Sequence, residues 1–231
     1  MFVSIDSGGI HVSRCAMNKI TPDYTLYLVT DRAAARGRSL EDVVHEAIEG
    51  GVTMVQLREK NAATNEILEL AMALRAVTAR SGVSFIINDR VDIALACGAD
   101  GVHVGQNDMK CSVARKIVGP GRIVGVSVST VQEAQDAEAD KADYLGVSPI
   151  FDTPTKRDTP PATGLDGLKR IRAAVRLPLV AIGGISAANA AAVIRSGADG
   201  LAVVSAIVAN PEPRSAARAL RLAIAKGRES K

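Results

Sequence analysis

The stretch CGADGVHV, residues 97–104, decides the fold, because three other stretches of the chain repeat its pattern. They are EGGVTMV (49–55), DKADYLGV (140–147) and SGADGLAV (196–203). In each one a short turn, with a glycine in three of the four, leads into an apolar run. The copies recur about every fifty residues, as expected of stacked two-βα modules. Four modules of two strands each predict eight strands.

The same alternation runs from residue 25 to the end of the chain. Short apolar runs alternate with longer amphipathic segments, which is the pattern of βα units around a parallel sheet. Eight parallel strands close into a (β/α)₈ TIM barrel without edges. A doubly wound open sheet is the alternative, and it is disfavoured because all eight strands are equally apolar and no G-x-G-x-x-G motif follows the first. We predict strands at 25–30, 52–57, 84–88, 101–105, 122–127, 143–148, 177–183 and 200–205, and helices at 39–49, 64–80, 129–139, 165–175, 186–195 and 214–226.

Length and composition are typical of one globular domain. The chain has 231 residues, of which 47% are hydrophobic, enough for a single α/β barrel. We assign residues 25–231 to the barrel, the catalytic domain, and residues 1–24 to an N-terminal extension. Aromatic residues make up only 3% and the net charge is +3, which argues against nucleic acid as a partner. Three cysteines without C-x-x-C spacing favour a reducing cytoplasm, and no apolar stretch approaches the roughly 18 residues of a membrane helix.

Polar residues follow the carboxyl ends of the predicted strands, where TIM barrels carry their chemistry. Asp89 and Asp108 end neighbouring strands, which lie about 5 Å apart, so both carboxylates can reach one hard cation. Arg58 and Lys60 follow the strand beside them and can bind the phosphate of a Mg²⁺-bound ligand. Either aspartate alone is more often a helix N-cap. The pair with its cations favours a magnesium site.

The last two strands end in groups suited to a second phosphate. AIGGIS (181–186) places Gly183 and Gly184 before a helix that we predict to begin at Ser186, so that backbone N–H groups face an anion. VVSAI (203–207) adds further N–H donors and the Ser205 hydroxyl. A tight strand-to-helix turn is the alternative explanation for the two glycines.

The sequence shows no strong general base or nucleophile. His11 lies in the extension, His45 within a helix, and His103 inside a strand, where a packed, hydrogen-bonded core histidine is more common than a catalytic one. No G-x-S-x-G elbow is present. Such a site suits a reaction whose main difficulty is the stabilisation of a departing pyrophosphate.

Seven clusters stand at the strand ends: QLREK (56–60), ND (88–89), HVGQND (103–108), GVS (125–127), PIFDTPTKRD (149–158), IGGI (182–185) and VVSAI (203–207). In this order, from about residue 25 to the C-terminus, they resemble the thiamine phosphate synthase family. This resemblance implies a magnesium-dependent transferase of thiamine biosynthesis. It would join 4-amino-2-methyl-5-(hydroxymethyl)pyrimidine diphosphate to 4-methyl-5-(2-phosphonooxyethyl)thiazole through a dissociative, carbocation-forming step and release pyrophosphate.

The resemblance also implies a role for each matching residue. Asp89 and Asp108 would hold Mg²⁺. Four residues are expected to be catalytic: Arg58, Lys60, Ser127 and Lys156. The pyrimidine diphosphate would be bound by Gln56, Leu57, Arg58, Glu59, Lys60, Asn88, Ser127 and Lys156. The thiazole phosphate would be bound by Thr153, Pro154, Thr155, Gly184, Val204 and Ser205.

The segment PIFDTPTKRDTPP (149–161) is too long and too polar for a simple turn. Long polar loops inside compact domains are usually lids or binding loops, and a solvated surface loop is the alternative. We expect Thr153 and Thr155 to reach one phosphate and Lys156 the other, so that closure requires both substrates and excludes water.

Two departures from the family pattern bear on alternative functions. Ser129 stands near a position where the family often has histidine, and Ser148 stands where glycine often precedes the Pro-Ile pair. A related thiazole tautomerase would need its catalytic histidine near Ser129. A catalytically silent phosphate-binding barrel is the other alternative, and it would not require the paired aspartates. The expected partners are the two small substrates, and a homo-oligomer stays open.

Overall fold

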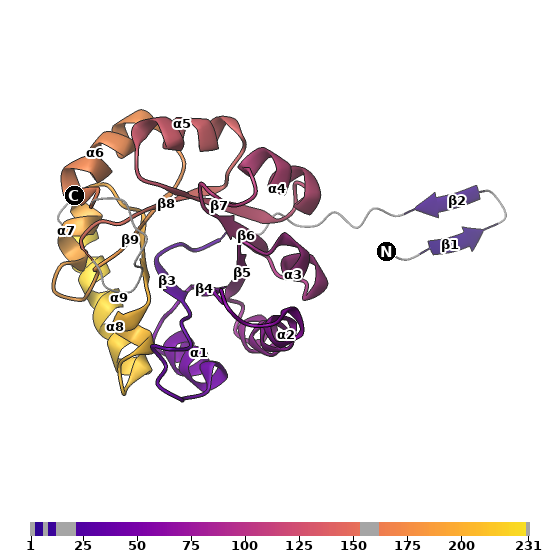
Figure 1. The fold of residues 1–231 in the computed structure, drawn as a ribbon, viewed down its shortest axis with the longest axis horizontal. Helices are drawn as coiled ribbons and strands as arrows, with labels where there is room; N and C mark the ends of the chain where they lie inside the picture. The colour runs from indigo at the N-terminus through magenta and orange to yellow at the C-terminus, as the bar shows by residue number, and fades with distance from the viewer. Residues whose placement is uncertain (1–2, 7–8, 13–21, 153–161, 230–231) are drawn as a thin grey trace.

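The eight predicted strands form a closed barrel. The computed structural model describes residues 3–6, 9–12, 22–152 and 162–229. Neighbouring strands are parallel around the whole ring, in the order β10-β3-β4-β5-β6-β7-β8-β9 (Figure 1). This closure confirms the TIM-barrel prediction and excludes the open sheet. The strands are β3 (Leu26–Val29), β4 (Met54–Leu57), β5 (Ser84–Asn88), β6 (Gly101–Val104), β7 (Ile123–Val128), β8 (Tyr144–Val147), β9 (Leu179–Ile182) and β10 (Gly200–Val203).

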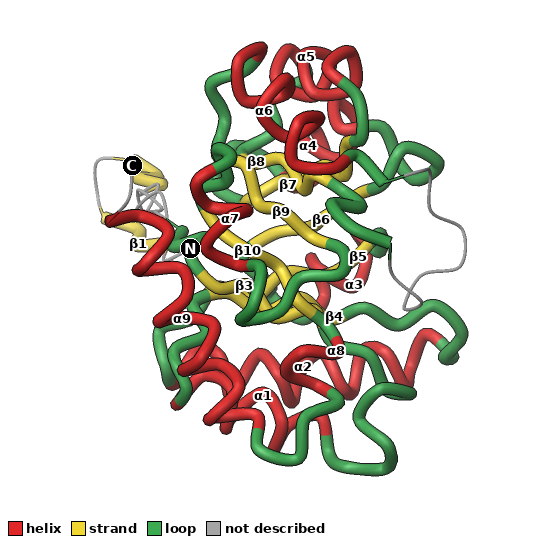
Figure 2. The backbone as a smooth tube through the Cα atoms, turned by 90° about the vertical axis from the view of Figure 1, so that its left-hand side faces the viewer, coloured by secondary structure: helices red, strands yellow, loops and turns green. Residues whose placement is uncertain are grey.

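Helices surround the strands and cover the outside of the barrel (Figures 1 and 2). The last helix, α9, packs against α1, α7 and α8, so the end of the chain lies beside the start of the barrel. Three helices, α3, α4 and α8, were not predicted, because runs of four to eight residues carry little periodic signal. No described helix has the length and apolar character needed to span a membrane. The helices are α1 (Leu40–Glu49), α2 (Thr64–Arg80), α3 (Val91–Ala96), α4 (Cys111–Val118), α5 (Val131–Ala139), α6 (Gly164–Ala174), α7 (Ala190–Arg195), α8 (Ser205–Val208) and α9 (Pro213–Glu229).

The predicted N-terminal extension contains a small antiparallel hairpin. Its strands are β1 (Val3–Asp6) and β2 (Gly9–Val12), with Val3 opposite Val12 and Asp6 opposite Gly9. These two strands form a sheet of their own, separate from the barrel sheet. The sequence predicts no element in this segment, so the hairpin is an addition from the structure.

Alternation along each strand divides the apolar side chains between two cores. In β3, Leu26 and Leu28 point outward and pack in the core beneath the helices, whereas Tyr27 and Val29 point into the barrel. The inner core is much smaller than the outer one. It consists of Tyr27, Val29, Met54, Ile86, Ile123, Tyr144, Val180 and Ala202.

The repeated turns share one structural role at the amino ends of the strands. In the 97–104 copy, the N–H of Asp100 donates to the carbonyl of Phe85 at 2.8 Å, and Oδ2 of Asp100 accepts from the N–H of Phe85 at 2.8 Å. The residue before each of β4, β6, β8 and β10 therefore bonds to the preceding strand through both its backbone N–H and its side-chain oxygen. The equivalent pairs are Asp143 with Val124, Asp199 with Leu179, and Thr53 with Leu26.

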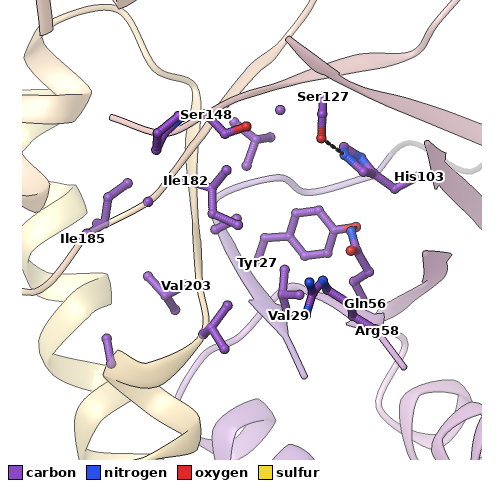
Figure 3. A pocket seen from close by; sticks show the side chains of 18 of the residues that line it. Tyr27, Val29, Gln56, Arg58, His103, Ser127, Ser148, Ile182, Ile185 and Val203 are labelled. Atoms are coloured by element: carbon purple, nitrogen blue, oxygen red, sulfur yellow. Dashed lines mark hydrogen bonds between the residues drawn. The ribbon is translucent and has the colours of Figure 1, made fainter. Parts of the chain in front are cut away.

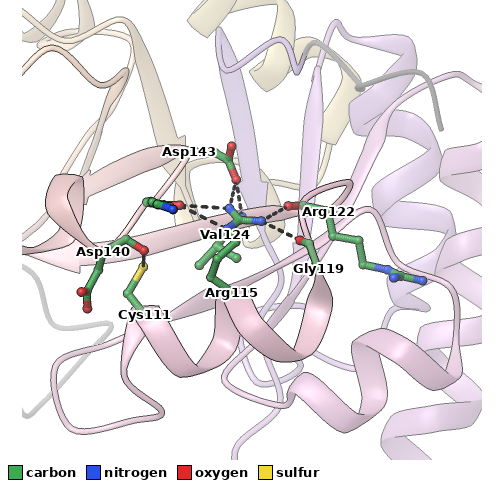
Figure 4. A network of polar contacts seen from close by, with 8 residues as sticks. Cys111, Arg115, Gly119, Arg122, Val124, Asp140 and Asp143 are labelled. Carbon is green, nitrogen blue, oxygen red and sulfur yellow. Dashed lines mark hydrogen bonds and ion pairs between the residues drawn. The ribbon is translucent and has the colours of Figure 1, made fainter. Parts of the chain in front are cut away.

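In three of the four modules the aspartate pairs with an arginine from the helix that precedes the odd-numbered strand of the module. Arg75 of α2 binds both carboxylate oxygens of Asp100, at 2.9 and 3.1 Å. Figure 4 shows the version in which Arg115 of α4 pairs with Asp143 and also donates to the carbonyl of Gly119 at 2.9 Å. Arg172 of α6 is 3.0 Å from Asp199. Thr53 is uncharged and needs no such partner.

Candidate active site

A cavity of about 400 Å³ opens among the carboxyl ends of the strands (Figure 3). All eight barrel strands contribute to its lining, which combines apolar walls with a limited number of polar groups. This is the end of the barrel where the sequence predicted the site. The polar side chains of the lining are Tyr27, Gln56, Arg58, Asn88, His103, Ser127, Tyr144, Ser148, Ser186 and Ser205.

The residues at the end of β4 bring a cation to the cavity. Arg58 lines it, and the N–H of Arg58 is fixed by a 3.1 Å bond to Oγ1 of Thr30. Among the described residues, the Arg58 guanidinium has no hydrogen-bond or ion-pair partner. A guanidinium in this position is suited to bind a phosphate oxygen pair. Gln56, in the same strand, is buried, and its Nε2 donates to Oη of Tyr27 at 2.8 Å.

The other members of the QLREK motif lie outside the cavity lining. Leu57 is buried in the outer core, so only its backbone could contact a ligand in the barrel mouth. Glu59 pairs with Arg32 at 3.4 Å. Lys60 is half-exposed, and its Nζ lies 3.8 Å from Oδ2 of Asp89. Lys60 therefore belongs to the carboxylate cluster beside the cavity.

Asp89 and Asp108 come together on the turns that follow β5 and β6. Asp89 has a φ of 59°, a left-handed conformation that aspartate tolerates better than most residues. Burial, the adjacent Asp108 carboxyl and its charge raise the pKa of Asp89 to about 6, and Lys60 only partly opposes this rise. Oδ2 of Asp108 accepts from the N–H of Gly105 at 2.9 Å, which holds this carboxyl in the turn.

The chemistry of this pair fits a magnesium ion. The Asp89 carboxyl, whose ionisation the neighbouring Asp108 disfavours, would be favoured in its charged form by a bound divalent cation. Mg²⁺ commonly takes one or two carboxylates and fills its remaining positions with waters and substrate phosphate oxygens. The described residues contain no group of three or more His, Cys, Asp and Glu side chains that could hold a metal. Asp89 and Asp108 supply two carboxylates, which is within the one or two that such a magnesium site commonly takes.

Across the cavity, the turn after β9 departs from the prediction. The helix expected at Ser186 begins at Ala190, so that prediction was wrong. Asn189 is the reason: its Oδ1 accepts from the N–H of Ser186 and its Nδ2 donates to the carbonyl of Gly184, both at 2.9 Å. These side-chain bonds make a turn that competes with the helix. Gly183 and Gly184 have φ of 107° and 64°, so the pair makes the bend next to the cavity.

The four-residue helix α8 follows β10 on the neighbouring strand. Gly184, Val204 and Ser205, which the sequence analysis assigned to the thiazole phosphate, all line the cavity. The first helical bond of α8 runs from the N–H of Val208 to the carbonyl of Val204, at 2.8 Å. The N–H groups of Ser205 and Ala206 therefore precede it and have no intrahelical acceptor.

Four predicted ligands, Thr153, Pro154, Thr155 and Lys156, lie outside the described residues. The chain enters their segment beside the cavity. The N–H of Ile150 donates to the carbonyl of Ile182 at 3.0 Å, and the N–H of Phe151 donates to that of Gly183 at 3.1 Å.

With this geometry established, comparison with known families identifies the chain. The family model described as thiamine monophosphate synthase matches residues 26–207. The chain belongs to the thiamine monophosphate synthase family. The matched span contains every strand of the barrel. The resemblance noted from the strand-end clusters is thus confirmed.

Individual members of the family are close to the chain over most of its length. The thiamine-phosphate synthase of Chloroflexus aurantiacus is 54% identical over 207 residues, which cover 90% of this chain and 95% of that protein. The thiamine-phosphate synthase of Syntrophomonas wolfei is 50% identical and covers 87% and 97%. The solved thiamine phosphate pyrophosphorylase of Pyrococcus furiosus superposes with a TM-score of 0.81 at 41% identity, over 89% of this chain and 97% of that one.

Three cavity residues were not assigned to the site from the sequence. Tyr27 and Tyr144 were not considered, and His103 was interpreted as a core histidine. His103 is buried and hydrogen-bonded, as that interpretation requires, but it also lines the cavity between Tyr144 and Ser127. Period-two alternation could have found all three, because each occupies an inward position of its strand.

Proposed function

We propose that the protein is a thiamine-phosphate synthase, a transferase that condenses 4-amino-2-methyl-5-(hydroxymethyl)pyrimidine diphosphate with 4-methyl-5-(2-phosphonooxyethyl)thiazole. The products are thiamine monophosphate and pyrophosphate. Membership of the thiamine monophosphate synthase family supports this activity, as do relatives of that name at about half identity over most of the chain. One observation supports the assignment of the site: Arg58 at the end of β4, and Gly184, Val204 and Ser205 after β9 and β10, line the same cavity at one barrel mouth.

The first group would bind the pyrimidine diphosphate. Arg58 and Lys60 would contact its phosphate oxygens, and Asp89 and Asp108 would hold a Mg²⁺ that offsets the negative charge of the diphosphate. Asn88 of β5 and Ser127 of β7 would also contact this substrate. Lys156, by the family resemblance, would complete the diphosphate site.

The second group would bind the thiazole phosphate. Gly184 ends the turn after β9, and Val204 and Ser205 begin α8 after β10, a strand directly paired with β9. The backbone N–H groups and the Ser205 hydroxyl would donate to the phosphate oxygens. Thr153, Pro154 and Thr155 would contribute from the loop after β8. The two phosphates would thereby orient the thiazole nitrogen toward the pyrimidine methylene carbon.

This arrangement suits a dissociative substitution. The methylene carbon–oxygen bond breaks first, its electron pair leaves with pyrophosphate, and the pyrimidine ring stabilises the resulting cation. The thiazole nitrogen then donates its lone pair to the methylene carbon. No proton is transferred in either step, so no general base is needed. Arg58 and Lys60 stabilise the charge that develops on the leaving group, and a bound Mg²⁺ would supply further electrostatic stabilisation there.

The position of Ser129 argues against a tautomerase. That activity would require a histidine here, but Ser129 is bonded to Glu133 of the capping box that starts α5. Its N–H and Oγ both contact Oε2 of Glu133, at 2.6 and 3.0 Å. A serine held in this way supplies no base to the cavity. A silent phosphate-binding barrel, in turn, gives no reason to place Asp89 against Asp108.

The assignment of the two groups can be tested by separating the two Michaelis constants. Arg58→Ala should raise the KM for the pyrimidine diphosphate on the order of tenfold to a hundredfold, because it removes a charge-assisted contact. Ser205→Ala should raise the KM for the thiazole phosphate about threefold to tenfold and leave the other KM unchanged. Arg218→Ala removes an exposed arginine of α9 and serves as the control. Equal effects of Arg58→Ala on both constants would contradict the assignment.

A further inference from the structure

Five polar side chains form one continuous chain of hydrogen bonds across the inside of the barrel. Nε2 of Gln56 donates to Oη of Tyr27 at 2.8 Å, and that oxygen lies 2.9 Å from Oη of Tyr144. Oη of Tyr144 lies 2.9 Å from Nδ1 of His103, and Nε2 of His103 lies 2.8 Å from Oγ of Ser127. Figure 3 shows the two ends, with Tyr27 directed at Gln56 and His103 bonded to Ser127. We call these five residues the polar chain.

Solvent does not reach the interior of the polar chain, so water cannot supply hydrogen-bond partners for its buried groups. Tyr144 is 0% exposed, Tyr27 is 1% exposed and Gln56 is 4% exposed. Burial raises the pKa of both tyrosines above the ordinary tyrosine value, so their hydroxyls keep their protons. Each buried hydroxyl must therefore donate its hydrogen to another member of the polar chain.

This requirement fixes the direction of every hydrogen bond. Tyr27 accepts from Gln56, so the Tyr27 hydroxyl donates to Tyr144. Tyr144 then donates to Nδ1 of His103, which must be the nitrogen without a hydrogen. A neutral imidazole carries its hydrogen on the other nitrogen, so Nε2 of His103 donates to Ser127. In the opposite direction, Tyr27 would accept from both Gln56 and Tyr144, and its own hydrogen would have no acceptor in the polar chain.

We propose that His103 and Tyr144 are positioning residues that fix Ser127 as a hydrogen-bond donor toward the pyrimidine ring. Because Oγ of Ser127 accepts from His103, its own hydrogen is left to point into the cavity. An aminopyrimidine offers ring nitrogens as acceptors there. The backbone of Ser127 is fixed as well, since its carbonyl accepts from Nε2 of Gln106 at 2.7 Å.

The proposal rests on the proposed function, because Ser127 is assigned there to the pyrimidine substrate. It adds that Ser127 is the hydrogen-bond donor, and the pyrimidine ring the acceptor, in that contact. A substrate analogue with a C–H group in place of the ring nitrogen would leave the Ser127 hydrogen without an acceptor, and a buried unpaired donor costs on the order of tenfold or more in binding. The polar chain is thus a specificity element as well as a positioning one.

The direct test is the tautomer of His103 in the full-length protein. The chain has three histidines, His11, His45 and His103, so ¹⁵N NMR of the imidazoles can be assigned by substituting each in turn. At a pH where the ring is neutral, His103 should carry its hydrogen on Nε2, with Nδ1 bare. A hydrogen on Nδ1, or an average of the two tautomers in fast exchange, would overturn the proposal.

Kinetics with Tyr144→Phe test the consequence. This variant keeps the ring and removes the link between Tyr27 and His103. We expect kcat/KM for the pyrimidine diphosphate to fall about tenfold or more, the KM for the thiazole phosphate to change less than about twofold, and the tautomer of His103 to become mixed. Tyr24→Phe is the matched control, because the Tyr24 ring packs on Tyr144 at 4.9 Å but its hydroxyl is not in the polar chain.

A pair of His103 variants separates a loss of positioning from a loss of folding. His103→Gln can still present an N–H to Ser127 and should keep more activity than His103→Leu, with both variants compared by thermal melting. If the wild type makes no thiamine monophosphate, the proposed function fails. If the wild type is active but Tyr144→Phe matches Tyr24→Phe, only the positioning proposal fails.

Discussion

The ties at the amino ends of the strands predict a large and specific loss of stability for Asp100→Ala. The Asp100 side chain is 10% exposed, binds Arg75 through two bonds and accepts the N–H of Phe85. Removing it leaves the arginine without its counter-charge and the N–H of a fully buried residue without an acceptor. Both losses occur where the start of β6 is hydrogen-bonded to β5.

The magnitude follows from these two losses. An unsatisfied buried N–H costs about 1–3 kcal/mol, and loss of one partner from a fully buried ion pair costs about 3–5 kcal/mol. The Arg75 side chain is 29% exposed and can recover part of its hydration. We therefore expect a loss of about 3 kcal/mol in the free energy of unfolding, or roughly 6–12 °C in Tm for a chain of this size.

Urea denaturation followed by far-ultraviolet circular dichroism measures this loss, since the chain contains no tryptophan. Asp92→Ala is the control: it removes an exposed partner of Arg90 and should cost less than about 1 kcal/mol. Asp100→Thr should lose roughly half as much as Asp100→Ala, because Thr53 serves as the N–H acceptor in the first module. If Asp100→Ala cost no more than Asp92→Ala, the structural role assigned to the repeat would be refuted.

Three further predictions concern the site. In the folded metal-free protein the pKa of Asp89 is about 6, compared with 3.8 for an ordinary aspartate. Protonated Asp89 therefore stabilises the fold fully below pH 3.8, and this stabilisation is lost as the pH rises through 6. Mg²⁺ must displace that proton, so calorimetry should show affinity falling about tenfold per pH unit below 6, and a flat profile from pH 5 to 8 would contradict this. Gly125→Ala would place a methyl group 2.1 Å from Cζ of Tyr144 and so push the Tyr144 ring aside. We expect a loss of about 1–3 kcal/mol in the free energy of unfolding, together with a reduced kcat/KM for the pyrimidine diphosphate. Gly184→Ala, at a φ of 64° and 2.8 Å from Cβ of Phe151, should raise the KM for the thiazole phosphate, and an unchanged KM would remove Gly184 from that subsite.

The fold could be predicted because the same physical pattern occurs four times. The turns before β4, β6, β8 and β10 resemble one another since each must supply an acceptor for the strand before it. What the repeat does not reveal is the partner of the aspartate. Arg75, Arg115 and Arg172 lie 25 to 28 residues before their aspartates in sequence, so only the folded geometry pairs them.

The helix boundary at Ser186 could not be predicted from glycines alone. The Asn189 side chain bonds back to Ser186 and Gly184, the residues before Ala190 form a turn, and the helix begins at Ala190. Local side-chain competition of this kind has no period and leaves no clear pattern in a single sequence.

The charged residues of the candidate site were suggested by the sequence, whereas Tyr27, His103 and Tyr144, which it missed, are buried. Asp89, Asp108 and Arg58 stand out as charged residues at strand ends. Tyr27 and Tyr144 resemble ordinary core residues, and their role is visible only when four strands bring their hydroxyls into contact with Gln56 and His103. A polar network across a barrel is a property of the closed ring rather than of any one segment.

The central claim is that Asp89 and Asp108 hold the magnesium ion that the reaction needs. The most direct measurement compares pyrophosphate release from both substrates by the wild type and Asp89→Asn, each with Mg²⁺ and with a chelator, alongside their thermal stability. The account predicts that the wild type releases pyrophosphate only with Mg²⁺, and that Asp89→Asn loses at least about a hundredfold in rate while remaining as stable as the wild type, because the substitution relieves the repulsion with Asp108 and asparagine tolerates the same φ. Undiminished release by Asp89→Asn, or release by the wild type in chelator, would contradict it.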